Sequence, residues 1–158
     1  MPKASMKKIA IDTPLAEITL RKYEKPSSLK DRELVRKLCL SLGLLQPGDS
    51  RDVMIDVLHV MLRAKKPLTS VQVENLVISR RKQAKQPLLG IAPSNIRRQL
   101  LRLRDIFILE KVKNNYIVRE KAKLVDLFNE HVEKYYMKSI LDRVSEYLKE
   151  ADKRFKRK

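Results

Sequence analysis

The sequence contains few of the residues that disulfides, metal centres and phosphate-binding loops require. Its 158 residues include one cysteine, three glycines, two histidines and no tryptophan. A single cysteine excludes an internal disulfide and a cysteine-based metal site, and three glycines leave no glycine-rich phosphate loop. His59 and His131 are distant in sequence and have no cysteine or paired carboxylates nearby. We therefore predict no enzyme activity, no metal and no cofactor.

Long apolar runs are also missing. No stretch approaches the roughly 20 apolar residues that cross a bilayer, and the N-terminal residues lack the long apolar core of a secretory signal. These absences predict a soluble intracellular protein, located in the cytoplasm and associated with the nucleoid.

Acidic residues are outnumbered. The chain has 19 Asp and Glu against 36 Lys and Arg, a formal net charge of +17. A field of this sign attracts polyanions, so DNA, RNA and an anionic membrane surface all fit it. The membrane is the least favoured of the three, and we predict no membrane partner.

The apolar residues, 43% of the chain, are sufficient for one compact domain with an added helical arm. A helix is predicted from a cap at Ser28 to a stop near Gly43, with Cys39 as a small core hydrophobe. A largely buried helix begins at Ser50 and includes His59, which we expect to be a partly buried structural histidine. A third helix begins with a cap at Thr69 or Ser70. Residues 7 to 23 favour a strand or an extended arm.

Residues 94 to 105 predict a helix with two different sides. Ile96, Leu100 and Leu103 share an apolar face that can pack on the preceding helices. Asn95, Arg98 and Arg102 lie away from that face, with Ser94, Arg97 and Arg104 beside it. Ser94 is a suitable N-cap. The first turn therefore offers backbone N–H groups together with Ser, Asn and Arg side chains, and such donors suit phosphate oxygens and base edges.

A hairpin is predicted directly after this helix. The runs "FILEKV" and "NYIV" can pair around residues 113 to 115, because asparagine tolerates the positive φ of a tight turn. Tyr116 is expected in the hairpin core and Phe107 inside the domain. Basic residues are concentrated here: residues 79 to 119 contain eleven Lys or Arg against Asp105 and Glu110, a net charge of +9.

Three helices followed by a hairpin, with a basic third helix, resemble the winged helix-turn-helix family. The resemblance covers roughly residues 50 to 119 and depends on "LTSVQVENLV", "SNIRRQLLRLRD" and "ILEKVKNNYIV" as second helix, recognition helix and wing. It implies that the third helix enters the DNA major groove and that the wing contacts a neighbouring phosphate or the minor groove. The overall pattern is similar to that of small archaeal transcriptional regulators. Two differences stand out: no glycine joins the third helix to the wing, and residues 83 to 93 form a long connection between the second and third helices.

The C-terminal region predicts a long helical arm with two apolar registers. Leu124, Phe128, His131 and Tyr135 form the first register, and a second register begins at Met137. Either the helix changes face near Tyr136 or there are two helices. This arm could fold back on the domain, but we favour a homodimer formed through it, since two-fold symmetry places recognition helices roughly 34 Å apart, about one DNA turn.

These observations predict a mainly α fold with a small β-hairpin wing. Residues 1–48 form an N-terminal extension with one helix, residues 49–120 a winged-helix DNA-binding domain, and residues 121–158 a helical dimerisation arm. The expected function is sequence-specific binding of double-stranded DNA, as in a transcriptional regulator. Structured-RNA binding and a winged-helix protein-interaction role in a nucleic-acid-processing complex are the alternatives. The expected DNA-binding residues, with Asn95 as an adenine reader, are Ser94, Asn95, Arg97, Arg98, Arg102, Arg80, Arg81, Lys82, Lys111, Lys113 and Asn114.

Overall fold

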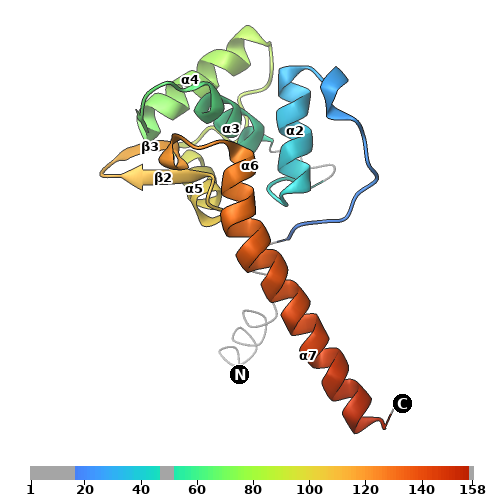
Figure 1. Cartoon of the computed structure of the whole chain (residues 1–158). Coiled ribbons are helices and arrows are strands. Elements are labelled where there is room, and N and C mark those ends of the chain that lie inside the picture. The colour runs from blue at the N-terminus through green and yellow to red at the C-terminus, as the bar shows by residue number, and fades with distance from the viewer. Residues whose placement is uncertain (1–16, 47–51, 157–158) are drawn as a thin grey trace, which may run out of the picture.

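The computed structural model describes residues 17–46 and 52–156, which form a mainly helical chain with a small three-stranded antiparallel sheet (Figure 1). The coarse fold predicted from the sequence, helices with one hairpin, is thereby confirmed. In chain order the elements are η1 (Pro26–Ser28), α2 (Asp31–Ser41), α3 (Val53–Arg63), β1 (Leu68–Thr69), α4 (Ser70–Gln83), α5 (Pro93–Asp105), β2 (Leu109–Val112), β3 (Asn115–Val118), η2 (Arg119–Lys121), α6 (Leu124–Leu127), η3 (Phe128–Met137) and α7 (Lys138–Arg154).

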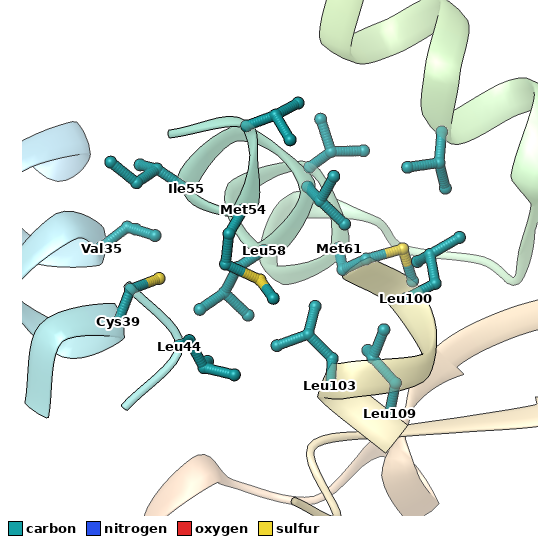
Figure 2. Packing of buried hydrophobic residues seen from close by; sticks show 14 of the residues in the cluster. Val35, Cys39, Leu44, Met54, Ile55, Leu58, Met61, Leu100, Leu103 and Leu109 are labelled. Carbon is teal, nitrogen blue, oxygen red and sulfur yellow. The ribbon is translucent and has the colours of Figure 1, made fainter. Parts of the chain in front are cut away.

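Helix α3 lies at the centre of the hydrophobic core. Every residue from Val53 to Met61 is buried, and α2, α4, α5 and β3 all contact the helix. Figure 2 shows side chains of α3, among them Leu58 and Met61, packed between α2 on one side and α5 on the other. The prediction of a largely buried helix is confirmed. The helix begins at Val53, after Asp52, and residue 50 lies outside the described residues.

Helix α2 belongs to the same core. Val35 and Cys39 are buried against α3, and burial raises the pKa of the Cys39 thiol to about 12. The expected role of Cys39 as a core hydrophobe is confirmed. The predicted cap is wrong, because Ser28 lies in η1 and α2 begins after Lys30 without a side-chain cap. Residues 17–25 are extended and form no strand, and residues 7–16 of the predicted arm lie outside the described part of the chain.

The sheet joins a short strand to the predicted hairpin. β3 pairs antiparallel with β2 on one side and with β1 on the other, so the order is β1-β3-β2. Strand β1, with Leu68 opposite Tyr116, was not expected from the sequence. Thr69 then caps α4 through a reciprocal pair of hydrogen bonds with Gln72, which identifies Thr69 rather than Ser70 as the cap.

Three helices end in the same hydrogen-bonding pattern, in which the residue after the cap has positive φ. Gly43 occupies this position after α2. Lys85 occupies it after α4, and Phe107 after α5, with φ values of 54° and 65°. Following α5, Phe107 N donates to Arg104 O and Ile108 N donates to Leu103 O, each at 3.0 Å. At this corner, where the sequence has no glycine, a phenylalanine therefore adopts the strained left-handed conformation.

The C-terminal arm is one long helix that changes face within its own length. The backbone stays right-handed helical through the joins of α6, η3 and α7, and η3 is wound as a π-helix. The prediction of one helix that changes face near Tyr136 is therefore correct, and the alternative of two separate helices is not. In π-winding, residues five apart lie above one another, and the inward positions are Leu127 with Val132 and His131 with Tyr136. The predicted inward position of Tyr135 is wrong, because that side chain is exposed.

The π-helical segment attaches the arm to the corner between α5 and β2. The Phe107 ring stacks on His131 with 4.6 Å between ring centroids and lies 5.8 Å from Tyr136. Tyr136 also donates a hydrogen bond of 2.6 Å to the carbonyl of Asp105, and the Arg119 guanidinium lies 5.7 Å from the Phe107 ring centre. Beyond this joint α7 extends away from the rest of the described chain (Figure 1).

Candidate nucleic-acid interface

Helix α5 has the two sides expected from its sequence. Ile96, Leu100 and Leu103 have no exposed surface and belong to the core, so the apolar face is confirmed. Ser94, Arg97 and Arg98 are exposed on other sides of the helix. Because α5 contacts α3, α4 and β2, the long connection before it does not displace it from the core.

The beginning of α5 differs by two residues from the prediction. Ala92 is the cap and Pro93 the first helical residue, a position that suits proline because its missing N–H would have no helical partner. Ser94 therefore lies inside the first turn and makes no capping bond. An open groove of about 810 Å³ runs along this turn and the preceding connection, and Ser94, Asn95 and Arg98 supply its polar lining.

Three polar side chains of α5 form a hydrogen-bonded row. Arg102 donates to Gln99 Oε1 at 2.9 Å, and Gln99 donates to Asn95 Oδ1 at 3.0 Å. Asn95 in turn donates to the carbonyl of Gly90 at 2.7 Å. Each end of the Asn95 amide therefore already makes one hydrogen bond, and these bonds hold the connection on α5. Its second N–H and its second lone pair are not used by these bonds, so adenine reading by Asn95 stays a prediction.

The three basic side chains at the end of α4 have different surroundings. Lys82 is exposed. Arg80 is half-buried and lies against His59, with 2.9 Å between Nη2 and the ring Nδ1. Arg81 is only 2% exposed and forms ion pairs with Asp52 and Asp56. Arg81 cannot reach a polyanion from this position, so its predicted DNA contact is wrong.

The Arg81 guanidinium is the centre of a buried ionic cluster. It also donates to the carbonyl of Pro87 at 2.7 Å, which fixes the connection after α4, and Arg32 of α2 pairs with the same two aspartates. Burial opposes ionisation of Asp52, but the hydrogen bond and charge of Arg81 outweigh it and lower the pKa of that carboxyl. Burial is likewise outweighed at Arg81, where the two carboxylates raise the pKa.

The hairpin extends beside α5 and presents its basic residues to solvent. Lys111, Lys113 and Asn114 are exposed, and Tyr116 is buried in the core as predicted. The positive φ of the two-residue turn falls on Lys113 and not on Asn114, contrary to the expectation from asparagine's tolerance. Lys111 lies over the Tyr116 ring, with Nζ 5.5 Å from its centre.

Several basic side chains of the described residues have no acidic partner. Among the residues that the structure describes, no carboxylate forms an ion pair with Lys82, Arg97, Arg98, Lys111 or Lys113. Their positive potential is therefore not cancelled locally and can act on a polyanion. The exposed basic side chains of α5 and the hairpin are therefore free of acidic partners among the described residues. Arg81, which is buried, and Arg80, which is half-buried, are less available than predicted.

Within residues 17–46 and 52–156 no three His, Cys, Asp or Glu side chains are grouped as a metal site would require, and no described helix is both long and apolar enough to cross a membrane. An apolar cavity of about 420 Å³ lies between the end of α2, the α5–β2 corner and α6. Its apolar lining does not suit a polyanion.

Comparisons with protein families, with characterised proteins and with solved structures find no match to this chain.

A signal for the buried ionic cluster is present in the sequence, although we did not predict the cluster from it. Asp52 and Asp56 are four residues apart, at the start of a mostly apolar helix. Acids at this spacing lie on one helical face, and a buried acid requires a cationic partner. The basic run at residues 80–82 was one possible source of such a partner.

Proposed function

We propose that this chain binds double-stranded DNA through α5 and the β2–β3 hairpin, with a sequence preference, and acts as a transcriptional regulator. The observation that carries the proposal is the division of α5 into two sides. One face is anchored in the core by fully buried aliphatic residues, while Arg97 and Arg98 are exposed and have no acidic partner among the described residues.

The order of elements supports a winged helix-turn-helix assignment for this part of the chain. Helices α3, α4 and α5, strand β1 between the first two helices, and a final hairpin follow one another, with β1 pairing to β3. Phe107 adopts the positive φ for which the family often uses glycine, which removes one of the two differences noted in the sequence. The other difference, the long connection, is held at two points, where Arg81 donates to Pro87 O and Asn95 donates to Gly90 O.

The dimensions of α5 favour duplex DNA over duplex RNA. A major groove of B-DNA, about 12 Å wide, admits an α-helix, whereas the deep and narrow major groove of A-form RNA does not. In this proposal Arg97 and Arg98 contact base edges or phosphates, and Ser94 donates to a phosphate at the start of the helix. Lys113 and Asn114, at the tip of the hairpin, contact a neighbouring phosphate.

Competition between nucleic acids at matched salt tests this function. A labelled duplex DNA of random sequence is bound to the chain, and unlabelled duplex DNA or duplex RNA of equal length is added as competitor. We expect DNA to compete at least tenfold better than RNA, and bound sequences recovered from a random pool to show a preferred site. Equal or better competition by RNA would favour RNA binding, and negligible affinity for both at physiological salt would favour a protein partner; either result overturns the proposal.

A further inference from the structure

Helix α7 exposes apolar side chains along its whole length. No residue of the helix is buried, and Leu141, Leu148 and Phe155, the last just after the helix, are 65%, 61% and 76% exposed. Figure 1 shows α7 extending from the joint without another element beside it. Contiguous apolar surface of this kind is typical of a face that another protein covers.

The spacing of these residues is that of a coiled-coil seam. Successive apolar positions are four and three residues apart in strict alternation, which places them at the a and d positions of a heptad. The seam consists of Met137, Leu141, Val144, Leu148, Ala151 and Phe155.

We propose that a second copy of this chain covers this face, with the two α7 helices antiparallel and centred on Glu146. This pairing goes beyond the proposed DNA binding. In this register each a position of one copy faces a d position of the other. Leu141 then faces Ala151, and Val144 faces Leu148. The outermost layer pairs Met137 with Phe155.

Side-chain volumes favour this orientation over a parallel one. An antiparallel pair places the small Ala151 against the larger Leu141, so the total side-chain volumes of the layers differ less than in a parallel pair. A parallel pair would place Ala151 against itself, which leaves a gap, and Phe155 against itself, which crowds the next layer.

Charges beside the seam favour the same orientation. In the antiparallel register Lys138 of one copy lies opposite Asp152 of the other, and two-fold symmetry repeats this pair. In a parallel pair, no oppositely charged residues of the two α7 helices meet at the positions that flank the seam. Ile140 of one copy would lie beside Ser145 of the other, and Tyr147 beside Asp152. The interface charges therefore distinguish the two orientations.

The overall charge of α7 also permits the approach of a second copy. The helix contains five basic and four acidic residues, although the whole chain carries +17. The repulsion between two strongly cationic chains is therefore weak along the surface that would be shared, since nearby opposite charges offset one another.

Cysteine cross-linking of the full chain tests the register and requires no nucleic acid, so its outcome is independent of the proposed DNA binding. The variants are Leu141→Cys, Ala151→Cys and the two combined; all change exposed or half-exposed positions of α7. Cys39 remains in place because it is fully buried, and free thiols are blocked before denaturation.

We expect mild oxidation to give a covalent dimer with the combined variant, and with an equimolar mixture of the single variants, but not with either single variant alone. In the antiparallel register, the thiols of two Leu141→Cys chains are offset by ten residues, about 15 Å along the helix, whereas disulfides need Cα atoms within about 7 Å. Cross-linking of Leu141→Cys with itself would show a parallel pair, and no cross-linking in any sample would exclude pairing on this face; both results overturn the proposal.

Charge reversal provides a second readout. Lys138→Asp should weaken the dimer measured by sedimentation roughly two- to tenfold, because two pairs are lost at once. Adding Asp152→Lys should restore the affinity. A dimer that responds to neither change would contradict the register even if cross-linking occurred.

Discussion

Arg80 and Arg81 are neighbours in the sequence, but their guanidinium groups have different surroundings. Arg81 points into the chain and holds Asp52, Asp56 and the connection before α5 together. Removing one member of such a buried ionic cluster leaves uncompensated charges in the interior and typically costs about 3–5 kcal/mol. We therefore regard Arg81 as a residue that positions the connection, and through it the first turn of α5.

The surroundings of His59 in the folded chain favour the neutral form of its ring. Arg63 donates to its Nε2 at 3.0 Å, and Arg80 lies against the same ring. A ring nitrogen can accept a hydrogen bond only when it carries no proton. Burial, together with the charges of Arg80 and Arg63, lowers the pKa of His59 below its ordinary value of 6.5.

The lowered pKa of His59 predicts a loss of stability in mild acid. As the pH falls below 6.5 the unfolded chain takes up a proton before the folded chain does, so the free energy of unfolding decreases until the lower pKa of the folded state is reached. Above 6.5 the ring is neutral in both states and contributes no slope. One such group changes stability by at most about 1.4 kcal/mol per pH unit.

Urea unfolding between about pH 7.5 and 5.0 measures this effect, with His59→Gln as the matched control. Glutamine can still accept hydrogen bonds from Arg63 and Arg80 but does not titrate, so the variant should lose part of the slope seen in the natural chain. Identical slopes for the two proteins would contradict the assignment of a neutral His59.

At the scale of elements, the corner between α5 and β2 depends on Phe107. A left-handed conformation costs a residue with a side chain about 1–2 kcal/mol, and here the ring contacts of Phe107 with His131 and Tyr136 offset that cost. The π-winding of η3 is what brings two residues five positions apart onto one aromatic ring. The corner and the arm therefore stabilise each other.

This dependence predicts an unusual order of stability for two substitutions. Phe107→Ala and Phe107→Gly both remove the ring contacts, but only glycine adopts positive φ without strain. The glycine variant should be the more stable of the two by about 1 kcal/mol, measured by urea unfolding, and both should be less stable than the natural chain. An alanine variant that equals or exceeds the glycine variant would mean that the corner relaxes to another conformation.

The elements that could be predicted from the sequence are those whose signal is local. The three- and four-residue spacing of Ile96, Leu100 and Leu103 defines one buried face whatever the partner is, and the two apolar runs around residues 113–114 define a hairpin. Strand β1 could not be predicted in this way, because two residues carry no period and Leu68 pairs with Tyr116 much later in the chain.

The environment of individual charged residues was likewise not predictable from local pattern. Arg81 and Lys82 are adjacent and look alike in sequence, yet only Arg81 meets Asp52 and Asp56, because the packing of α4 on α3 decides which side chain turns inward. The inward turn of Tyr136 in place of Tyr135 also follows from π-winding, which a count based on α-helical spacing does not anticipate.

For the whole molecule, charge is distributed unevenly. Residues 79–119 carry a net charge of +9, while α7 is nearly balanced. Duplex binding by such a surface should depend steeply on salt, because each phosphate neutralised releases counterions from the DNA. This distribution supports the proposed nucleic-acid contact of α5 and the hairpin, and the proposed pairing of the arm with a second copy.

The most direct test of the central claim compares duplex DNA affinity after removing two positive charges from different parts of the chain. One variant combines Arg97→Ala with Arg98→Ala on α5; the control combines Arg143→Ala with Lys149→Ala, at exposed positions of α7 off the apolar seam. Both should unfold at the same urea concentration as the natural chain, since none of these side chains is buried.

Fluorescence anisotropy with a labelled selected duplex, at one fixed salt concentration, then gives the result. Each base-reading arginine contributes about 1–3 kcal/mol, so we predict that the α5 variant binds at least tenfold more weakly, while the α7 variant changes little. Equal loss of affinity in both variants, or no loss in the α5 variant, would contradict the claim that the exposed side of α5 is the surface that meets DNA.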